Sequence, residues 1–240
     1  MNKNVRIILK LIIVVGLLVN LPYPKVYSET NSEEITKEVS EKSEVTKTVN
    51  KKNGKSIYIY NTHQSEEYHT NSVVEGSKYL MKLLESKGYE VVYETHDFEK
   101  YKKERNINYR YSYTVSRMFT KQAISNHGQF DMLIDFHRDS VKKSATTLNY
   151  NSKSYAKLMF VVGKTSSNYP TTKTEAQKLA NALNKKVPGI SRGVYVKNSH
   201  YNQHVAKNMF LIEVGAHQNT YTEIKNSLVV LASVIDSYLS

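Results

Sequence analysis

The chain has 240 residues, a hydrophobic content of 40% and no cysteine. This length allows one domain with its own hydrophobic core, and the lack of cysteine excludes disulfides and zinc sites that use cysteine ligands. The formal net charge of +12 favours polyanionic surfaces such as wall polymers, anionic lipid or nucleic acid, although scattered lysines can also serve solubility alone.

Residues 1–28 have the composition of a signal peptide. Basic residues precede an apolar run from Leu11 to Leu21, which is too short for a comfortable bilayer span of about 20 residues. The alternative is an uncleaved anchor that uses Ile7 to Leu21. In both cases we expect the rest of the protein to lie outside the membrane. Removing the four basic residues of this segment from +12 leaves +8, so targeting does not account for the basic excess.

Residues 29–55 are polar and highly charged, with Glu and Lys alternating irregularly. Such a composition offers too little apolar area to offset the entropy of folding, so we expect a disordered charged linker. A short amphipathic helix in this segment is the alternative.

From residue 56 onward, apolar strand patterns alternate with helical patterns, and we expect one domain over residues 56–240. The patterns predict strands at 57–61, 90–94, 132–136, 158–162, 193–196 and 209–214, and helices at 73–86, 109–125, 174–186 and 222–239. This alternation predicts an α/β fold with a mixed, mostly parallel sheet of about five or six strands and helices on both faces.

Three of the predicted strands end in residues that carry chemistry: His63, His137 and Glu213. In open α/β sheets, ligands bind in the crevice outside the carboxyl ends of the strands. Glu66 follows His63 by three residues, a spacing that lets both side chains reach one ion. Two imidazoles and one carboxylate are a ligand set that zinc hydrolases use, so we expect a divalent metal site here.

Glu213 interrupts an apolar run that should be buried, Phe210 to Gly215. A buried carboxylate is costly unless it is paired or bound to a metal. One interpretation is a salt bridge to a buried arginine or an exposed strand end. The functional interpretation is a general base for a metal-bound water, because burial also shifts the pKa towards catalytic use.

Several sequence blocks in this order resemble the stage II sporulation protein P family of cell-wall hydrolases, which is related to zinc-dependent N-acetylmuramoyl-L-alanine amidases. The resemblance covers nearly all of residues 56–240 and departs at Asn61, where the family usually has histidine. The blocks are Tyr60–Tyr68, Ile134–Ser140, Phe160–Gly163, Pro188–Gly193, Tyr201–Gln203, Leu211–Gly215, Asn219–Thr220 and Glu223.

The resemblance implies roles for individual residues. His63, Glu66 and His137 look like ligands of Zn²⁺, and Glu213 looks like the catalytic base. In the related amidases the carboxylate ligand comes from the first long helix, which makes Glu75 the alternative to Glu66. Four further residues are expected to line the substrate groove, where stem-peptide carboxylates suit arginine: Arg138, Arg192, Asn202 and Gln203.

The resemblance further implies an amidase-like fold and a secreted or anchored extracytoplasmic amidase that cleaves stem peptides from glycan strands of peptidoglycan in sporulation or engulfment. Endopeptidase action on stem peptides is a second activity of the family. Peptidoglycan is the expected partner, with other sporulation wall hydrolases such as a lytic transglycosylase as further candidates. No nucleic acid is expected, and the membrane is expected only through the N-terminal segment. The alternative function is a non-catalytic wall-binding module that kept the fold and lost the metal.

Overall fold

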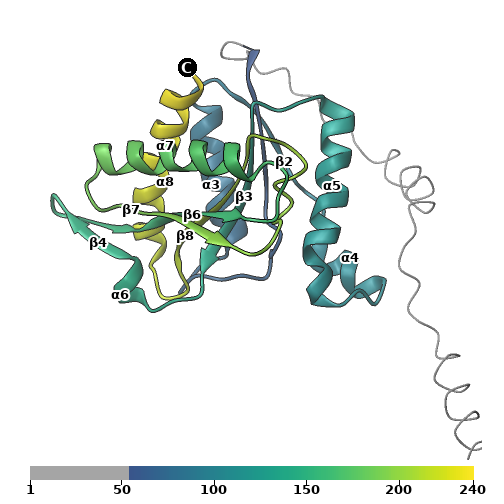
Figure 1. Cartoon of the computed structure of the whole chain (residues 1–240). Helices are drawn as coiled ribbons and strands as arrows, with labels where there is room; N and C mark the ends of the chain where they lie inside the picture. Colours follow the sequence, from purple (N-terminus) through teal and green to yellow (C-terminus); the bar gives the residue numbers. More distant parts are fainter. Residues whose placement is uncertain (1–53) are drawn as a thin grey trace, which may run out of the picture. The chain divides into compact units, whose positions relative to one another are not determined.

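The computed structural model describes residues 54–240 (Figure 1). The predicted signal peptide and nearly all of the predicted linker therefore lie outside the described residues. Within the described range, no helix combines the length and the apolar character that a membrane crossing needs.

Strands and helices alternate along the chain, as the sequence patterns predict. The strands are β1 (Ser56–Tyr60), β2 (Glu90–Tyr93), β3 (Met132–Asp139), β4 (Thr147–Tyr150), β5 (Lys153–Ala156), β6 (Leu158–Gly163), β7 (Ser191–Lys197) and β8 (Met209–Ala216). The helices are α3 (Val73–Glu85), α4 (Phe98–Glu104), the 3₁₀ turn η3 (Tyr109–Tyr111), α5 (Ser112–His127), α6 (Lys143–Thr146), α7 (Tyr169–Lys186) and α8 (Tyr221–Leu239).

Six strands form one sheet in the order β2-β1-β3-β8-β6-β7, and β4 and β5 form a separate hairpin. Every neighbouring pair in the large sheet is parallel except β8 and β6, which are antiparallel. The predicted fold class, a mixed and mostly parallel sheet in an α/β domain, is thus confirmed.

The elements that the sequence patterns miss are short or begin irregularly. Helix α4, α6 and the β4–β5 hairpin were not predicted. Helix α7 begins at Tyr169 rather than at 174, because Pro170 occupies its first turn, where proline lacks only a hydrogen bond that would be unmade in any case.

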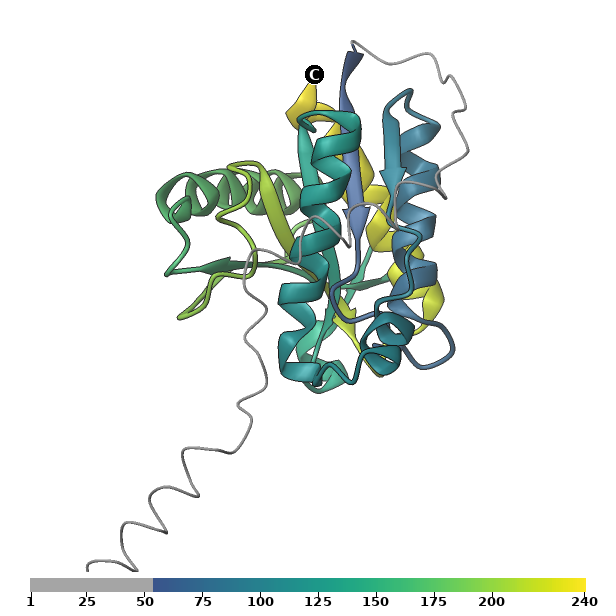
Figure 2. The same ribbon diagram turned by 90° about the vertical axis from the view of Figure 1, so that its right-hand side faces the viewer.

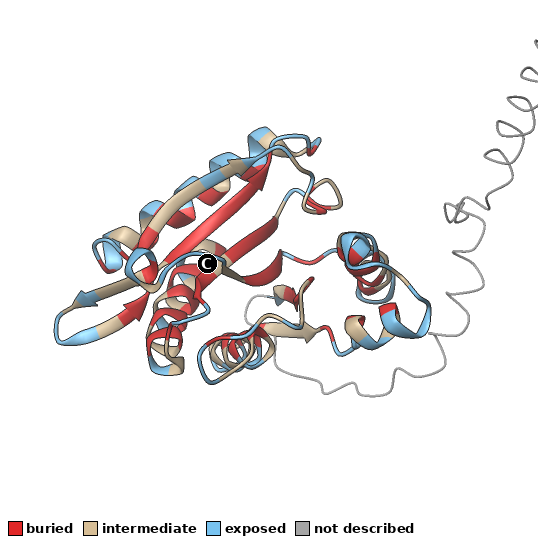
Figure 3. Cartoon of the chain, turned by 90° about the horizontal axis from the view of Figure 1, so that it is seen from below, coloured by how far each residue is buried: buried red, intermediate tan, exposed pale blue. Residues whose placement is uncertain are grey.

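Helices cover both faces of the large sheet (Figures 1 and 2). On one face, the apolar sides of α3, α7 and α8 pack on strand residues that include Ile59, Phe136 and Ile212. On the other face, α4 and α5 pack on Tyr58, Tyr60 and neighbouring strand residues. Figure 3 shows that the buried residues gather in the strands and on the helix sides turned towards them.

The beginning of α3 bears on the choice of metal ligands. Ser72 and Glu75 form a capping box, in which the Ser72 side chain accepts from the Glu75 N–H and the Glu75 carboxylate accepts from the Ser72 N–H. This arrangement satisfies backbone donors that have no partner within the helix. The Glu75 carboxylate is therefore bound at the start of α3 by the backbone of Ser72.

The ion pair between His96 and Glu94 predicts a pH-dependent contribution to stability. His96 Nδ1 lies 2.6 Å from Glu94 Oε1, and this contact raises the pKa of His96 above its usual value. Because the folded-state pKa is the higher one, the stabilisation is complete below the unfolded-state pKa and is lost as pH rises through the folded-state value. We expect His96→Gln to lower the urea midpoint most below about pH 6.5 and progressively less above it.

The matched control is His69→Gln, since His69 is exposed and makes no ion pair with any described residue. A His96→Gln effect that is constant from pH 5.5 to pH 9, with metal removed by chelator from both proteins, would contradict this assignment.

Candidate active site

The parallel pairing of β1, β3 and β8 brings the predicted chemical residues to one edge of the sheet. His63 follows the end of β1 within three residues, His137 is near the end of β3, and Glu213 lies in the last part of β8. The register pairs His137 directly with Glu213. Since neighbouring strands lie about 4.8 Å apart, these two side chains share one face of the sheet at close range.

The two histidines approach each other through this arrangement. The ring centroids of His63 and His137 are 5.4 Å apart, and the rings are inclined by 76°. Tyr109 stacks on the ring of His63, with a centroid distance of 4.8 Å. The Nδ1 atom of His63 is buried and has no hydrogen-bond partner among the described residues.

Of the two candidate carboxylate ligands, only Glu66 is placed beside a site histidine. Its Oε2 atom lies 3.6 Å from Nδ1 of His137 and accepts a hydrogen bond from the backbone N–H of Arg138. Glu75 is exposed, and its oxygens bind Ser72 and Asn71 at the start of α3.

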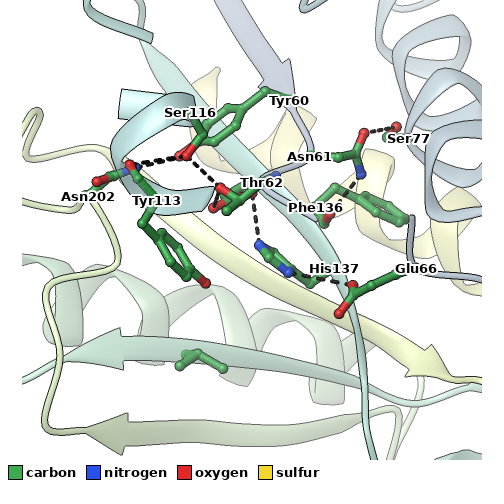
Figure 4. Close-up of polar contacts among 12 residues, drawn as sticks. Tyr60, Asn61, Thr62, Glu66, Ser77, Tyr113, Ser116, Phe136, His137 and Asn202 are labelled. Atoms are coloured by element: carbon green, nitrogen blue, oxygen red, sulfur yellow. Dashed lines mark hydrogen bonds and ion pairs between the residues drawn. The ribbon is translucent and has the colours of Figure 1, made fainter. Parts of the chain in front are cut away.

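A second carboxylate, Asp135, lies behind His137 and is fully buried, with 0% of its surface exposed. Its Oδ1 atom is 2.8 Å from Nε2 of His137, a close ion pair without the alignment of a hydrogen bond. The backbone N–H and the hydroxyl of Thr62 both donate to the Asp135 carboxylate, at 2.9 and 2.7 Å. With Nε2 of His137 facing Asp135, Nδ1 of the same ring faces Glu66 (Figure 4).

The network continues from Thr62 into α5 and the chain that precedes β8. The Thr62 hydroxyl lies 2.8 Å from Oγ of Ser116, which accepts from the amide of Asn202 at 3.0 Å. The same amide donates to the carbonyl of Tyr113 at 2.8 Å. Figure 4 shows these side chains as one continuous set of polar contacts.

The ionisable groups of the site perturb one another. Burial raises the pKa of Glu213 to about 7, against the opposing effect of His137. Burial lowers the pKa of His63, and the neighbouring His137 lowers it further. Burial opposes the charged form of His137 as well, but the carboxylates of Asp135 and Glu66 raise its pKa well above the usual value. A carboxyl group with a pKa near 7 can accept and release a proton at neutral pH.

The donor atoms suit zinc in kind and number. Residues 54–240 hold no group of three or more His, Asp or Glu side chains already arranged to hold a metal ion. Nevertheless, the buried atoms without hydrogen-bond partners include Nδ1 of His63 and Oε2 of Glu213, and Glu66 faces His137. Two imidazoles and one carboxylate, with a fourth position left for water, are the ligands of a catalytic zinc site.

Two of the four residues expected to line the substrate groove are buried in this structure. Asn202 is 2% exposed and Gln203 is 0% exposed, so neither side chain is on the surface. Gln203 instead bridges the N–H of Gly163 and the carbonyl of Val161, at 2.8 Å each, and ties the loop before β8 to strand β6.

Arg138 and Arg192 do lie at the edge of the site and remain partly exposed. Arg192 forms an ion pair with Asp139. The Arg138 guanidinium donates to the carbonyls of Glu67 and Asp139.

Three residues at the site were not predicted: Asp135, Tyr109 and Tyr113. Asp135 had a signal in the sequence, because it interrupts the apolar run of β3 as Glu213 interrupts that of β8. The tyrosines had none, since nothing in their spacing distinguishes them from the other 17 tyrosines of the chain.

The position of Asp135 yields a testable consequence for metal affinity. Carboxylates that orient a ligand histidine typically contribute 10–100-fold to metal affinity. We expect Asp135→Asn to lower zinc affinity by about 10- to 100-fold, as measured by competition with a chromophoric chelator. The control is Asp131→Asn, because Asp131 precedes the same strand and accepts from the N–H of Ser56 far from the site. Equal zinc affinity of the two variants would contradict the role of Asp135.

Comparison with known proteins places the chain in a family. Residues 22–236 match the family Stage II sporulation protein P (SpoIIP). The Stage II sporulation protein P of Bacillus subtilis (strain 168) is 31% identical over an alignment of 201 residues, and the alignment covers 75% of this chain. The chain spans about half the length of that relative, since the alignment covers 50% of it.

Among solved structures, the CwlD amidase from Clostridioides difficile, determined in complex with the GerS lipoprotein, shares the fold with a TM-score of 0.53 at 17% sequence identity. The alignment covers 77% of this chain and 98% of that one. The extent of the family match and the identity to the Bacillus subtilis protein lead to one conclusion: this chain belongs to the stage II sporulation protein P family.

Proposed function

We propose that this protein is a zinc-dependent N-acetylmuramoyl-L-alanine amidase that acts on peptidoglycan outside the cell membrane during sporulation. The observation that carries the proposal is the pairing of His137 with Glu213 across β3 and β8, with His63 and Glu66 beside His137. Family membership supports the sporulation role, and the amidase fold supports the class of reaction.

His63, Glu66 and His137 would hold the zinc ion. A bound zinc ion lowers the pKa of its water to about 7 and polarises the scissile carbonyl. Asp135 holds the His137 ring by its Nε2, so that Nδ1 faces the site. The N–H of Arg138 holds the Glu66 carboxylate in place on the other side.

Glu213 is the proton carrier in this proposal. Its raised pKa, about 7, lets it accept a proton from the attacking water and return it to the nitrogen of the leaving group. Near the end of β8, Gly215 has a φ of +63°, and a Cβ atom there would lie 2.9 Å from the side chain of Asn219. Both the conformation and the close contact require glycine two residues after Glu213.

Substrate recognition is assigned to the exposed edge of the site. Arg138 and Arg192 present guanidinium groups there, and stem peptides of peptidoglycan carry carboxylates that such groups bind well. The Asp139 carboxylate holds Arg192, so a substrate carboxylate would share this arginine with Asp139. Arg138 and Arg192 are two of the basic residues behind the formal net charge of +12.

A first prediction concerns the metal ligands. Purified protein is expected to carry one zinc ion per chain, measured by elemental analysis. His63→Ala, His137→Ala and Glu66→Gln should each lose zinc and activity. Glu75→Gln is the matched control for Glu66→Gln and should retain both, because the amide oxygen can still serve the cap of α3. Zinc loss in Glu75→Gln with retention in Glu66→Gln would reverse the assignment.

A second prediction concerns Glu213. Because the residue carries protons and does not hold the metal, Glu213→Gln should bind zinc as the wild type does. Its release of peptides from sacculi, followed by mass spectrometry of the new ends, should fall by about 10²-fold or more. If zinc is lost together with activity, Glu213 is a ligand and the roles assigned here are wrong.

A further inference from the structure

Tyr113 lies beside both histidines of the candidate site. It lies in the first turn of α5, and its ring meets His63 edge to face at 5.5 Å. The same ring is nearly parallel to that of His137, with a centroid distance of 6.4 Å and an angle of 15°. An aromatic ring that contacts both histidines borders the space in which any substrate bond must be placed.

The backbone and ring of Tyr113 are held firmly. Its carbonyl accepts hydrogen bonds from Asn202 and Ser116, which belong to the network that anchors Asp135. Its ring packs against that of Tyr201 at 5.4 Å. These contacts fix where the hydroxyl can point.

The hydroxyl of Tyr113 forms no hydrogen bond with any residue in the range 54–240. By contrast, the hydroxyls of Tyr58 and Tyr68, which pack in the core nearby, donate to Glu94 and to the carbonyl of Val214. The Tyr113 side chain is only partly buried, so its hydroxyl is accessible to solvent and to a ligand. Figure 4 shows the Tyr113 hydroxyl pointing away from α5, beside the ring of His137. A fixed donor without a protein partner, at the centre of a candidate site, is available to a ligand.

We propose that Tyr113 is a catalytic residue whose hydroxyl donates a hydrogen bond to the carbonyl oxygen of the scissile amide as that oxygen becomes negatively charged. The inference rests on the amide hydrolysis proposed above. Donors that are fixed before the reaction starts stabilise developing charge at no reorganisation cost, and losing one typically costs about 10²- to 10³-fold in rate.

The bonds and protons balance in this step. The water oxygen bonds to the carbonyl carbon, the π electrons move to the carbonyl oxygen, and Glu213 takes one proton of the water. The carbon–nitrogen bond then breaks, the carbonyl re-forms, and Glu213 returns the proton to the nitrogen. Tyr113 keeps its own proton throughout, since the phenol titrates only near pH 10 or above.

The test is Tyr113→Phe in the full-length protein, which keeps the ring beside the histidines and removes only the hydroxyl. With a soluble muropeptide as substrate, we expect kcat to fall by about 10²-fold while KM changes little. Zinc content and the thermal unfolding midpoint should match those of the wild type. A phosphinate analogue of the scissile amide, which mimics the tetrahedral state, should lose affinity by the same factor as kcat/KM.

Tyr111→Phe is the matched control. Tyr111 is two residues away, exposed, and bonded through its hydroxyl only to Arg110 among the described residues, so its removal should leave kcat unchanged. Wild-type kcat in Tyr113→Phe, or loss of zinc or of thermal stability in that variant, would overturn the role of Tyr113 alone. A wild-type protein with zinc bound that releases no peptide from the muropeptide would overturn the proposed amidase function, and this inference with it.

Discussion

A carboxylate removed completely from water destabilises a protein unless its charge is compensated, and Asp135 is in that position. Thr62 donates two hydrogen bonds to it, and Nε2 of His137 lies 2.8 Å from its Oδ1 atom. The charge therefore links the end of β1 to the middle of β3. Through Ser116 and Asn202 the same network reaches α5 and the loop before β8. The position of His137, and with it the geometry of the candidate site, depends on this group.

The unequal covering of the two sheet faces determines where chemistry can take place. Helices α3, α7 and α8 bury one face along its length, and α4 and α5 cover the other mainly over β2, β1, β3 and the start of β8. The side chains of Asp135, His137 and Glu213 belong to that second face, at the edge of the cover. Partial burial there raises the pKa of Glu213 to about 7, a value that exposure would not produce.

Some polar residues next to the candidate site stabilise the fold and take no part in the proposed chemistry. Asn61 is buried at the end of β1, where its amide donates to the carbonyl of Phe136 and its oxygen accepts from Ser77. Gln203 likewise serves the backbone of β6. These contacts explain why polar residues next to a candidate site need not contact substrate: each one satisfies buried backbone groups that would otherwise lack partners.

The sequence by itself determined the α/β class, most strand and helix positions, and the three strand ends that carry His63, His137 and Glu213. These follow from local rules, because hydrophobic periodicity and the position of a polar residue at the end of an apolar run depend only on near neighbours. Only the tertiary structure decided that Glu66 rather than Glu75 lies beside His137, that Asn202 and Gln203 are interior, and that Tyr113 contacts both histidines. Each of these depends on contacts between segments distant in the chain, namely the contact of Glu66 with the end of β3, the packing of the loop before β8, and the docking of α5 on the sheet. No local pattern records such contacts, since their free energy exists only once the strands have paired and the helices have packed.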